Sequence, residues 1–423
     1  MPPALRSFVK GAEDTCFPIQ NLPYGIFRPT PAEHPRPGVA IGDYVLDLCA
    51  VARARLFKGP LLSNSSCFFQ ESLNQFMSMG RPAWKEARET IQALLSADNM
   101  TLQENVDLEA TVFVPMSQVT MELPAVIGDY TDFYSSKEHA TNLGIMFRGK
   151  DNALPVNWLH LPIGYHGRSS SIVVSGTDFV RPRGQTTPGK DGIPEYKASQ
   201  LLDFELEMAV FIGPGNELGK PVSVEDANDQ IFGFVLMNDW SARDLQKWEY
   251  VPLGPFLGKN FGTTISPWII TMEALEPFIC KAPEQDPAPL PYLKDSKRIT
   301  FDIPLSVAIK PHGEKESVIT RSNFKYLYWT VAQQIAHHTV NGCNLRPGDL
   351  LASGTISGPD GSYGSMIELS WAGSKEVKLE NGGGVRKFIQ DGDEVIITAN
   401  CEGDGYYIGF GPCGGKILPA ITE

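Results

Sequence analysis

Four acidic residues lie where predicted strands and turns can bring their carboxylates together. Glu205 and Glu207 belong to the apolar run 204–211. Because successive side chains of a strand alternate between its two faces, both glutamates face the same side. Asp239 ends a second apolar run, and Asp132 lies in a turn rich in aromatic residues. Carboxylates without a thiolate suit Mg²⁺, Ca²⁺ or Mn²⁺ rather than Zn²⁺, so the pattern predicts a divalent-cation site.

A plainer interpretation of these residues stays open at this point. A lone Glu-x-Glu pair is usually the solvent-facing side of a half-buried strand, and the two aspartates shift the balance toward a metal site. The segment after Asp239 has the same two interpretations. In a helix, Asp239, Arg243, Gln246 and Tyr250 would share one polar face, which looks either toward the metal or toward solvent.

Two further segments carry residues suited to ligand binding or proton transfer. The glycines of 258–264 allow close approach of the backbone to a ligand, but the spacing is not that of a P-loop, which excludes nucleotide binding. His139 follows Asp132 closely and is an acid–base candidate at neutral pH, although a histidine taken at random is more often structural. His337 and His338 fit the favourable dipole at the end of a predicted helix, and we interpret them as structural.

The elements that must position these residues divide into two parts. The first part contains a predicted hairpin at 38–46 and a helix after Pro82 whose apolar residues fall on one face. Leu123-Pro124 marks the change to a β-rich part. We therefore predict an N-terminal domain at 1–123 and a C-terminal domain at 124–423.

Many short strands are predicted in the second part, because glycine and proline punctuate its β-type runs. The predicted strands are 171–174, 204–212, 231–237, 268–271, 299–309, 366–371 and 394–399. One clear helix is predicted, with Ser322 as its N-cap and Asn341-Gly342 at its end.

Composition disfavours several classes of function. Hydrophobic residues make up 42% of the 423 residues, an ordinary fraction for a protein with a real core. The 36 Lys plus Arg against 49 Asp plus Glu give a net charge of 36 − 49 = −13, which disfavours nucleic-acid binding. No apolar run of about 18 residues predicts a membrane span. The N-terminus lacks the apolar core of a secretory signal, so we expect a cytoplasmic protein.

Five longer strings resemble the fumarylacetoacetate hydrolase family, and within it the fumarylacetoacetases of tyrosine catabolism. The strings are 17–25, 129–134, 139–148, 238–250 and 351–358. The similarity extends over nearly the whole chain, from Phe17 to Pro419. This resemblance implies a mainly β fold with some α, in which a small SH3-like β-barrel is followed by a large β-roll or β-sandwich. It also implies a homodimer.

The resemblance implies a role for each candidate residue. The four carboxylates would bind a first cation, Mg²⁺ or Ca²⁺, and a second cation would lie near Asp239, Thr263 and the backbone carbonyl of Lys259. His139 is the implied general base, and Glu368 is the residue that orients it. The implied donors to an oxyanion are Arg243, Gln246 and Lys259. The implied substrate contacts are Tyr134, Arg148, Tyr165, Gln246, Tyr250 and Thr355.

The implied reaction is metal-dependent hydrolysis of the carbon–carbon bond of a dicarboxylic β-diketone, 4-fumarylacetoacetate, to fumarate and acetoacetate. A base with a pKa near neutrality can activate water, and a divalent cation can hold a diketone as its enolate. Two alternatives remain open. One is a related hydrolase or decarboxylase that acts on another β-diketo or acylpyruvate acid. The other is a non-catalytic β-protein with a structural metal, which gives His139 no role.

Overall fold

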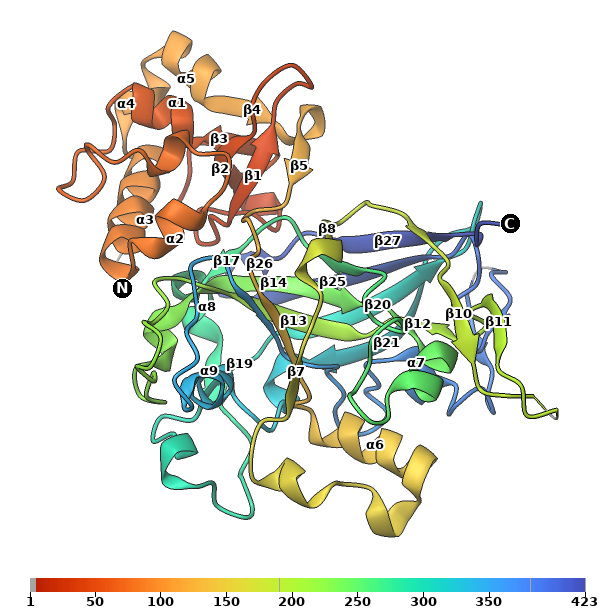
Figure 1. The fold of residues 1–423 in the computed structure, drawn as a ribbon. Coiled ribbons are helices and arrows are strands. Elements are labelled where there is room, and N and C mark those ends of the chain that lie inside the picture. The colour runs from red at the N-terminus through yellow and green to blue at the C-terminus, as the bar shows by residue number, and fades with distance from the viewer. Residues whose placement is uncertain (1–4, 190, 381, 423) are drawn as a thin grey trace.

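The computed structural model describes residues 5–189, 191–380 and 382–422, which form two stacked units (Figure 1). The small N-terminal unit is an open half-barrel of antiparallel strands in the order β4-β3-β2-β1-β5. Its strands are β1 Tyr24–Arg28, β2 Arg36–Ile41, β3 Tyr44–Asp47, β4 Phe113–Pro115 and β5 Thr120–Glu122. Its helices are α1 Leu48–Arg53, α2 Asn74–Ser78, α3 Arg81–Leu95, α4 Met100–Gln103 and α5 Val106–Val112.

Both elements predicted for this unit are confirmed. Strands β2 and β3 form the hairpin, and Gly42 in its turn has a φ of 56°, which glycine adopts without strain. The helix after Pro82 is α3, whose apolar face, including Trp84 and Ile91, is buried. An amphipathic helix of this kind is held mainly by the packing of that face.

The large unit contains two main sheets that contribute to one apolar core. The larger sheet has the order β7-β6-β22-β13-β14-β16-β8, and β17 also pairs with β14. Its strands are β6 Tyr130–Phe133, β7 Gly164–His166, β8 Ile172–Val174, β13 Leu206–Ile212, β14 Ile231–Asp239, β16 Thr263–Ile265, β17 Ile270–Thr271 and β22 Leu350–Ala352. The second sheet has the order β21-β20-β25-β27-β9, and β26 pairs with β25. Its strands are β9 Phe179–Val180, β20 Pro304–Lys310, β21 Ser317–Asn323, β25 Glu394–Glu402, β26 Tyr407–Gly409 and β27 Cys413–Leu418.

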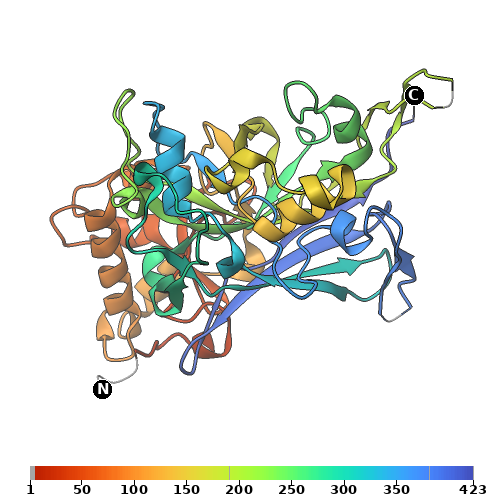
Figure 2. The ribbon, with the colours of Figure 1, turned by 90° about the horizontal axis from the view of Figure 1, so that it is seen from below.

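Short helices and two-stranded ribbons complete the large unit. The helices are α6 Lys137–Arg148, α7 Arg243–Glu249, α8 Met272–Leu275, α9 Val331–Thr339 and α10 Met366–Leu369. The ribbon strands are β10 Arg183–Thr186 with β11 Glu195–Ala198, β12 Leu202–Asp203 with β15 Ser241–Ala242, β18 Ile279–Lys281 with β19 Ile299–Phe301, and β23 Val377–Lys378 with β24 Val385–Arg386. Helix α6 lies on the side of the large unit that faces away from the N-terminal unit, as Figures 1 and 2 both show.

The larger sheet brings distant parts of the sequence side by side. Asp132 on β6 pairs with Ala352 of β22, and β22 pairs in turn with β13, which carries Glu207. Strand β13 pairs with β14, which ends at Asp239, and Asp239 pairs with Thr263 of β16. The acidic residues therefore lie on a group of neighbouring strands.

The fold class predicted from the sequence is confirmed: a mainly β chain with a small N-terminal and a large C-terminal β unit. The predicted strands 171–174, 204–212, 231–237 and 394–399 correspond to β8, β13, β14 and β25. The run 299–309 is interrupted at Asp302 and Ile303, and only Ile270–Thr271 of the run 268–271 forms a strand.

Two element predictions were wrong. The predicted strand 366–371 is instead helix α10, whose first amides donate to Asp203 rather than to a neighbouring strand. The helix predicted from Ser322 begins later, because Ser322 belongs to β21, which pairs with β20. Helix α9 begins at Val331 after Thr330, whose hydroxyl forms a capping box with the first turn.

In the part of the chain that is described, no helix has the length and the apolar character that a membrane crossing requires.

A single hydrophobic core joins the two units. Phe76 and Trp84 of the N-terminal unit contact Phe232 of β14, with ring centroids 5.7 and 5.2 Å from it, and Tyr24 lies 5.8 Å from the same ring. Such aromatic pairs add to the free energy of burial. This core contains residues from both sides of the predicted boundary between residues 123 and 124, so it does not separate two domains there. The boundary stays a prediction.

The shared core predicts that the two units unfold together. Phe232→Ala should lower the free energy of unfolding by about 3–5 kcal/mol, the usual cost of truncating a buried phenylalanine. Urea unfolding followed by tryptophan fluorescence and far-ultraviolet circular dichroism checks this, with Leu253→Ala as a control because Leu253 is 97% exposed. Separate transitions of the two units in the wild-type protein would contradict the prediction.

Candidate active site

Three carboxylates meet at the larger sheet. Asp132, Glu207 and Asp239 each offer an oxygen, and these oxygens all lie within 4.8 Å of one another. All three side chains are buried, and Glu207 is 0% exposed. The solvent-face interpretation of the glutamate pair is therefore wrong. The face of β13 that carries Glu207 continues with Ala209 and Phe211, which pack in the core shared with the N-terminal unit.

The chemistry of this cluster fits a divalent cation. Asp132 Oδ1 and Glu207 Oε1 are buried and have no hydrogen-bond partner among the described residues. Burial, with the neighbouring charge of Asp239, raises the pKa of Asp132 to about 8. Burial and the charges of Asp132 and Asp239 also raise the pKa of Glu207 well above its usual value. Buried oxygens that lack a donor and repel one another are the ligands that a hard cation prefers.

Glu205 has different partners from the other three acids. Its carboxylate contacts the ammonium of Lys259, and its Oε1 lies 2.8 Å from Arg243 Nη2. Burial alone would raise the pKa of Glu205, but the charges of Lys259 and Arg243 lower it to about 2. Glu205 is therefore ionised and already paired, and its predicted role as a metal ligand stays a prediction.

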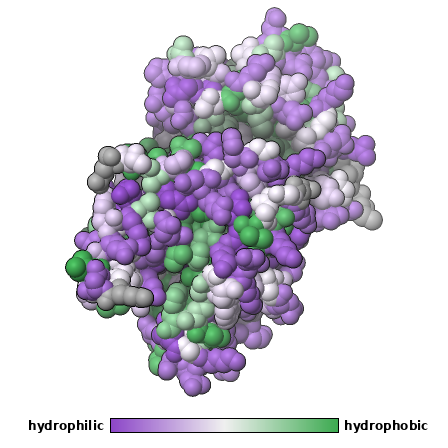
Figure 3. Space-filling model, turned by 90° about the vertical axis from the view of Figure 1, so that its right-hand side faces the viewer, coloured by the Kyte–Doolittle hydropathy of each residue, from purple (hydrophilic) through white to green (hydrophobic). Residues whose placement is uncertain are grey.

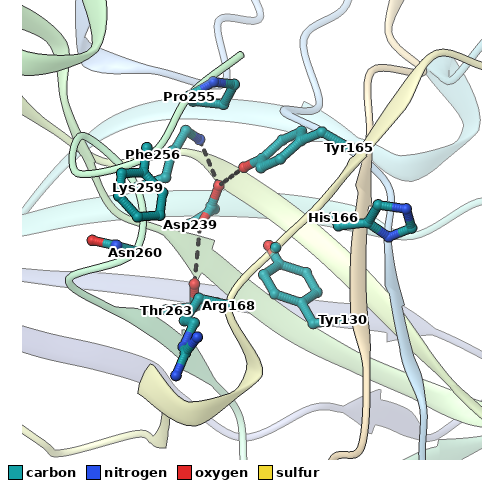
Figure 4. Close-up of a pocket in the computed structure, with 11 residues that line it drawn as sticks. Tyr130, Tyr165, His166, Arg168, Asp239, Pro255, Phe256, Lys259, Asn260 and Thr263 are labelled. Carbon is teal, nitrogen blue, oxygen red and sulfur yellow. Dashed lines mark hydrogen bonds and ion pairs between the residues drawn. The ribbon is translucent and has the colours of Figure 1, made fainter. Parts of the chain in front are cut away.

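Asp239 has three side-chain partners, Lys259, Tyr165 and Thr263, as Figure 4 shows. Its Oδ2 accepts from Lys259 Nζ at 2.5 Å and from the Tyr165 hydroxyl at 3.1 Å, while its Oδ1 accepts from Thr263 Oγ1 at 2.9 Å. These residues line a cavity of about 210 Å³, which Phe256 also borders. The predicted second cation falls in this region, where the structure places the Lys259 side chain against Asp239.

His139 and Glu368 form a buried pair. His139 lies in the first turn of α6, where its amide donates to the Ser136 hydroxyl, and its Nδ1 lies 2.7 Å from Glu368 Oε2. Glu368 comes from α10, and both side chains are at most 2% exposed. Burial alone would raise the pKa of Glu368, but His139 and surrounding donors lower it. An ionised Glu368 favours the proton on Nδ1, so Nε2 is the ring nitrogen that remains to accept one.

Arg243 lies at the start of α7 and is held between two carboxylates. Its Nε donates to Asp203 Oδ2 at 2.9 Å, and its Nη2 lies 2.8 Å from Glu205 Oε1. Gln246 follows on the same helix, and its Oε1 is buried without a partner among the described residues. The predicted polar helix face was wrong at its two ends. Asp239 ends strand β14, and Tyr250 follows the last turn of α7 with 52% of its surface exposed.

The remaining predicted substrate contacts differ in how far they are buried. Tyr134 is half-buried, and its ring meets that of His139 edge to face, with centroids 5.5 Å apart. Thr355 is buried. Arg148 ends α6 and is exposed, and its guanidinium donates to the carbonyls of Asn152 and Ala153. The predicted contact of Arg148 with a substrate carboxylate therefore stays a prediction.

Sequence reasoning missed the residues that support the predicted ones. Glu368 accepts hydrogen bonds from the side chains of Asn142, Ser357 and Ser365. Asp203 accepts a hydrogen bond from Arg243, and the sequence contained a pattern that could have identified Asp203. The alternation of acids at Glu205 and Glu207 begins one step earlier, at Asp203, so the pattern is three acids at every second residue.

Comparison with known proteins places this arrangement in a family. The family described as Fumarylacetoacetase N-terminal matches residues 20–124, and the one described as Fumarylacetoacetate (FAA) hydrolase C-terminal matches residues 129–417. The fumarylacetoacetase of Oryza sativa subsp. japonica is 59% identical over 423 residues, covering 99% of this chain and 98% of that protein. The fumarylacetoacetase of Bos taurus is 61% identical over 419 residues, covering 98% of this chain and 99% of that protein. This chain belongs to the fumarylacetoacetase family.

The resemblance stated from the sequence is thereby confirmed. A solved structure named fumarylacetoacetate hydrolase from psychrophilic Exiguobacterium antarcticum shares the fold with a TM-score of 0.53. It is 18% identical, and the match covers 94% of this chain and 99% of that chain. At this identity the likeness concerns the fold, while the close fumarylacetoacetase relatives carry the family assignment.

The raised pKa of Asp132 predicts how a divalent cation stabilises this fumarylacetoacetase-family chain at different pH. Folded, metal-free protein keeps the Asp132 proton up to about pH 8, whereas an unfolded aspartate loses it at about pH 3.9. The folded state thus binds more protons within this window, and the free energy of unfolding of the metal-free protein falls as pH rises. A cation requires the deprotonated carboxylate, so the stabilisation it provides grows with pH.

We expect the rise in Tm on adding Mg²⁺ or Ca²⁺ to chelator-treated protein to be larger at about pH 8 than at about pH 5.5. Thermal unfolding with and without the cation measures this. Glu207→Gln should abolish the rise. Asp393→Asn should retain it, because Asp393 is a buried carboxylate paired with Arg386 outside the cluster. A rise that is independent of pH would contradict the assignment.

Proposed function

We propose that this chain hydrolyses the carbon–carbon bond of 4-fumarylacetoacetate to fumarate and acetoacetate, the last step of tyrosine and phenylalanine catabolism. The observation that carries this proposal is identity of about 60% along 98% or more of the chain with proteins named fumarylacetoacetase. The buried acids and the His139–Glu368 pair supply groups that such a hydrolysis needs: a base, cationic donors and ligands for a metal.

His139 is the proposed base. Its Nε2 takes a proton from water, and the charge of Glu368 stabilises the imidazolium that forms. The resulting hydroxide adds to the fumaryl carbonyl, the bond to the neighbouring carbon breaks, and the electron pair leaves on the acetoacetate fragment. The His139 imidazolium returns its proton to that carbon, which completes acetoacetate, while the carboxyl group formed at the fumaryl carbon ionises to carboxylate.

The charged residues around Glu205 are the proposed stabilisers of developing negative charge. Arg243 and Lys259 are held as cations by Glu205, Asp203 and Asp239, which raise the pKa values of both cations despite their burial. Together with the Gln246 amide they are the proposed oxyanion donors. In other enzymes one such donor contributes about 3–4 kcal/mol to the transition state. Substrate binding is proposed for Tyr134, Arg148, Tyr165, Tyr250 and Thr355.

Mg²⁺ or Ca²⁺ is the proposed cofactor, with Mn²⁺ as a third candidate. Asp132, Glu207 and Asp239 would hold it, joined by Glu205 if the Lys259 ammonium moves aside. A bound cation would supply Lewis-acid chemistry that favours the enolate form of a β-diketone. The proposed second cation near Asp239, Thr263 and the Lys259 carbonyl likewise requires the Lys259 side chain to give way.

A homodimer is proposed from the surface beside α7. The segment that follows this helix exposes apolar side chains, with Val251 at 67%, Leu253 at 97% and Phe256 at 67%. Figure 3 shows hydrophobic residues gathered within the polar surface of the face on this side of the molecule. Apolar surface of this kind is characteristic of a contact between subunits, and a two-fold dimer is the commonest such assembly. Sedimentation of the wild-type protein tests this.

The activity is tested by incubating the purified protein with fumarylacetoacetate and following the loss of the ultraviolet absorbance of the diketone. Stoichiometric fumarate and acetoacetate are expected, with loss of turnover on chelation and recovery on adding Mg²⁺ or Ca²⁺. Turnover of an acylpyruvate but not of fumarylacetoacetate would replace the proposal with the related activity.

His139→Ala should lower kcat by roughly 10²–10⁴, the span that losing a general base usually costs. Metal content should change little, because imidazole is not among the proposed oxygen ligands. His337→Ala is the matched control, since His337 is a packed histidine whose Nδ1 lies 3.0 Å from the Tyr292 hydroxyl in another part of the unit. Wild-type turnover in a stable, metal-loaded His139→Ala protein would assign the base to another group.

A further inference from the structure

Asp203 is fully buried, with 0% of its surface exposed, and both of its oxygens have partners. Oδ2 accepts from Arg243 Nε at 2.9 Å and from the Ile367 amide at 3.0 Å. Oδ1 accepts from the Met366 amide at 2.6 Å. One carboxylate thus binds both Arg243 and the start of helix α10.

These two attachments lead to the two halves of the proposed site. Arg243 forms an ion pair with Glu205, and the other oxygen of Glu205 contacts the Lys259 ammonium. Helix α10 carries Glu368, which lies 2.7 Å from His139. Asp203 is therefore the shared support of the cationic donors on one side and of the base with its orienting carboxylate on the other.

Helix α10 depends on this support. It has only 4 residues, and so short a helix is not stable by itself. Ser365 stands at its N-cap but does not cap it. Its hydroxyl donates instead to Glu368 Oε2 at 2.7 Å. The first two amides of the helix, which have no partner within a helix, are satisfied by Asp203.

We propose that Asp203 is a positioning residue, which holds the Arg243 guanidinium and the Glu368 carboxylate in a fixed relation across the reacting centre. This inference rests on the hydrolase function proposed above. A displacement of catalytic groups by about 1 Å can cost about 10²-fold in rate. A support that fixes both groups at once therefore affects turnover more than substrate binding.

Asp203→Asn tests the proposal at nearly constant volume. In either orientation of the new side chain its NH₂ group opposes a donor: Arg243 Nε–H and the Ile367 amide if it replaces Oδ2, or the Met366 amide if it replaces Oδ1. We expect kcat to fall by about 10-fold to 100-fold while KM changes by less than about 3-fold. Metal content should equal that of the wild-type protein.

Asp393→Asn is the matched control. Asp393 is also a buried carboxylate paired with an arginine, Arg386, and it also accepts from a backbone amide, that of Gln390. We expect this variant to lose stability and keep wild-type kcat. If Asp203→Asn fails to fold, Asp203→Ser retains one acceptor for α10, leaves space for water, and should show the same fall in kcat.

A double-mutant cycle separates positioning from a general loss of structure. Asp203→Asn is combined with Arg243→Gln and, separately, with Glu368→Gln. If Asp203 acts through both residues, its effect on kcat should be smaller in each background than in the wild-type protein, because each background leaves only one of the two supports in place. Wild-type kcat in the Asp203→Asn protein would overturn the inference. So would an Asp203→Asn effect on kcat that is as large in both backgrounds as in the wild-type protein. Absence of cleavage by the wild-type protein would instead overturn the proposed function.

Discussion

A carboxylate that moves from water into a protein interior loses several kcal/mol of hydration unless donors or cations replace the water. The large unit buries one connected cluster of five carboxylates and two cations. Its members are Asp132, Asp203, Glu205, Glu207, Asp239, Arg243 and Lys259. With every group ionised, the charge of the cluster would be 2 − 5 = −3. Arg243 and Lys259 neutralise the side around Glu205, and Asp132 and Glu207 are left without a cation. The excess of negative charge, together with burial, raises the pKa values of these two acids. A bound divalent cation would neutralise this excess charge.

In this fold the larger sheet brings these charges together. The acids come from strands far apart in the sequence, and they lie next to one another through β-pairing. Strands β13 and β14 are buried on both faces: Phe234 and Leu236 pack in the core of the large unit, and Phe232 and Val235 pack in the core shared with the N-terminal unit. The N-terminal unit thus shields one face of the sheet that holds the cluster.

The sequence pattern predicted those elements whose conformation is decided by residues close together in the chain. Strands such as 204–212 and the hairpin at 38–46 were visible because alternation and turn residues act over a few positions. The acids themselves were found, but alternation could not distinguish a solvent face from a face buried by the N-terminal unit. Their convergence, and the pairing of Glu205 with cations rather than with the other acids, depend on contacts between distant segments.

The supporting residues were missed for the same reason. Helix α10 looked like a strand because its residues are apolar, and its helical form depends on Asp203, which lies far away in the sequence. Likewise, the position of Glu368 beside His139 is set by tertiary contacts with Asn142 and Ser357. The family resemblance suggested the pair of His139 and Glu368. The residues that hold this pair in place were identified only from the three-dimensional structure.

The exchange of protons for a cation in the buried acid cluster can be measured by calorimetry. Mg²⁺ or Ca²⁺ is titrated into chelator-treated protein at about pH 7 in buffers of different ionisation enthalpy, which reports the protons released for each cation bound. Because the pKa of Asp132 is about 8, binding should release about one proton or more for each cation, and Asp132→Asn should release fewer. Cation binding without proton release, or no binding to the wild-type protein, would contradict the assignment of these carboxylates.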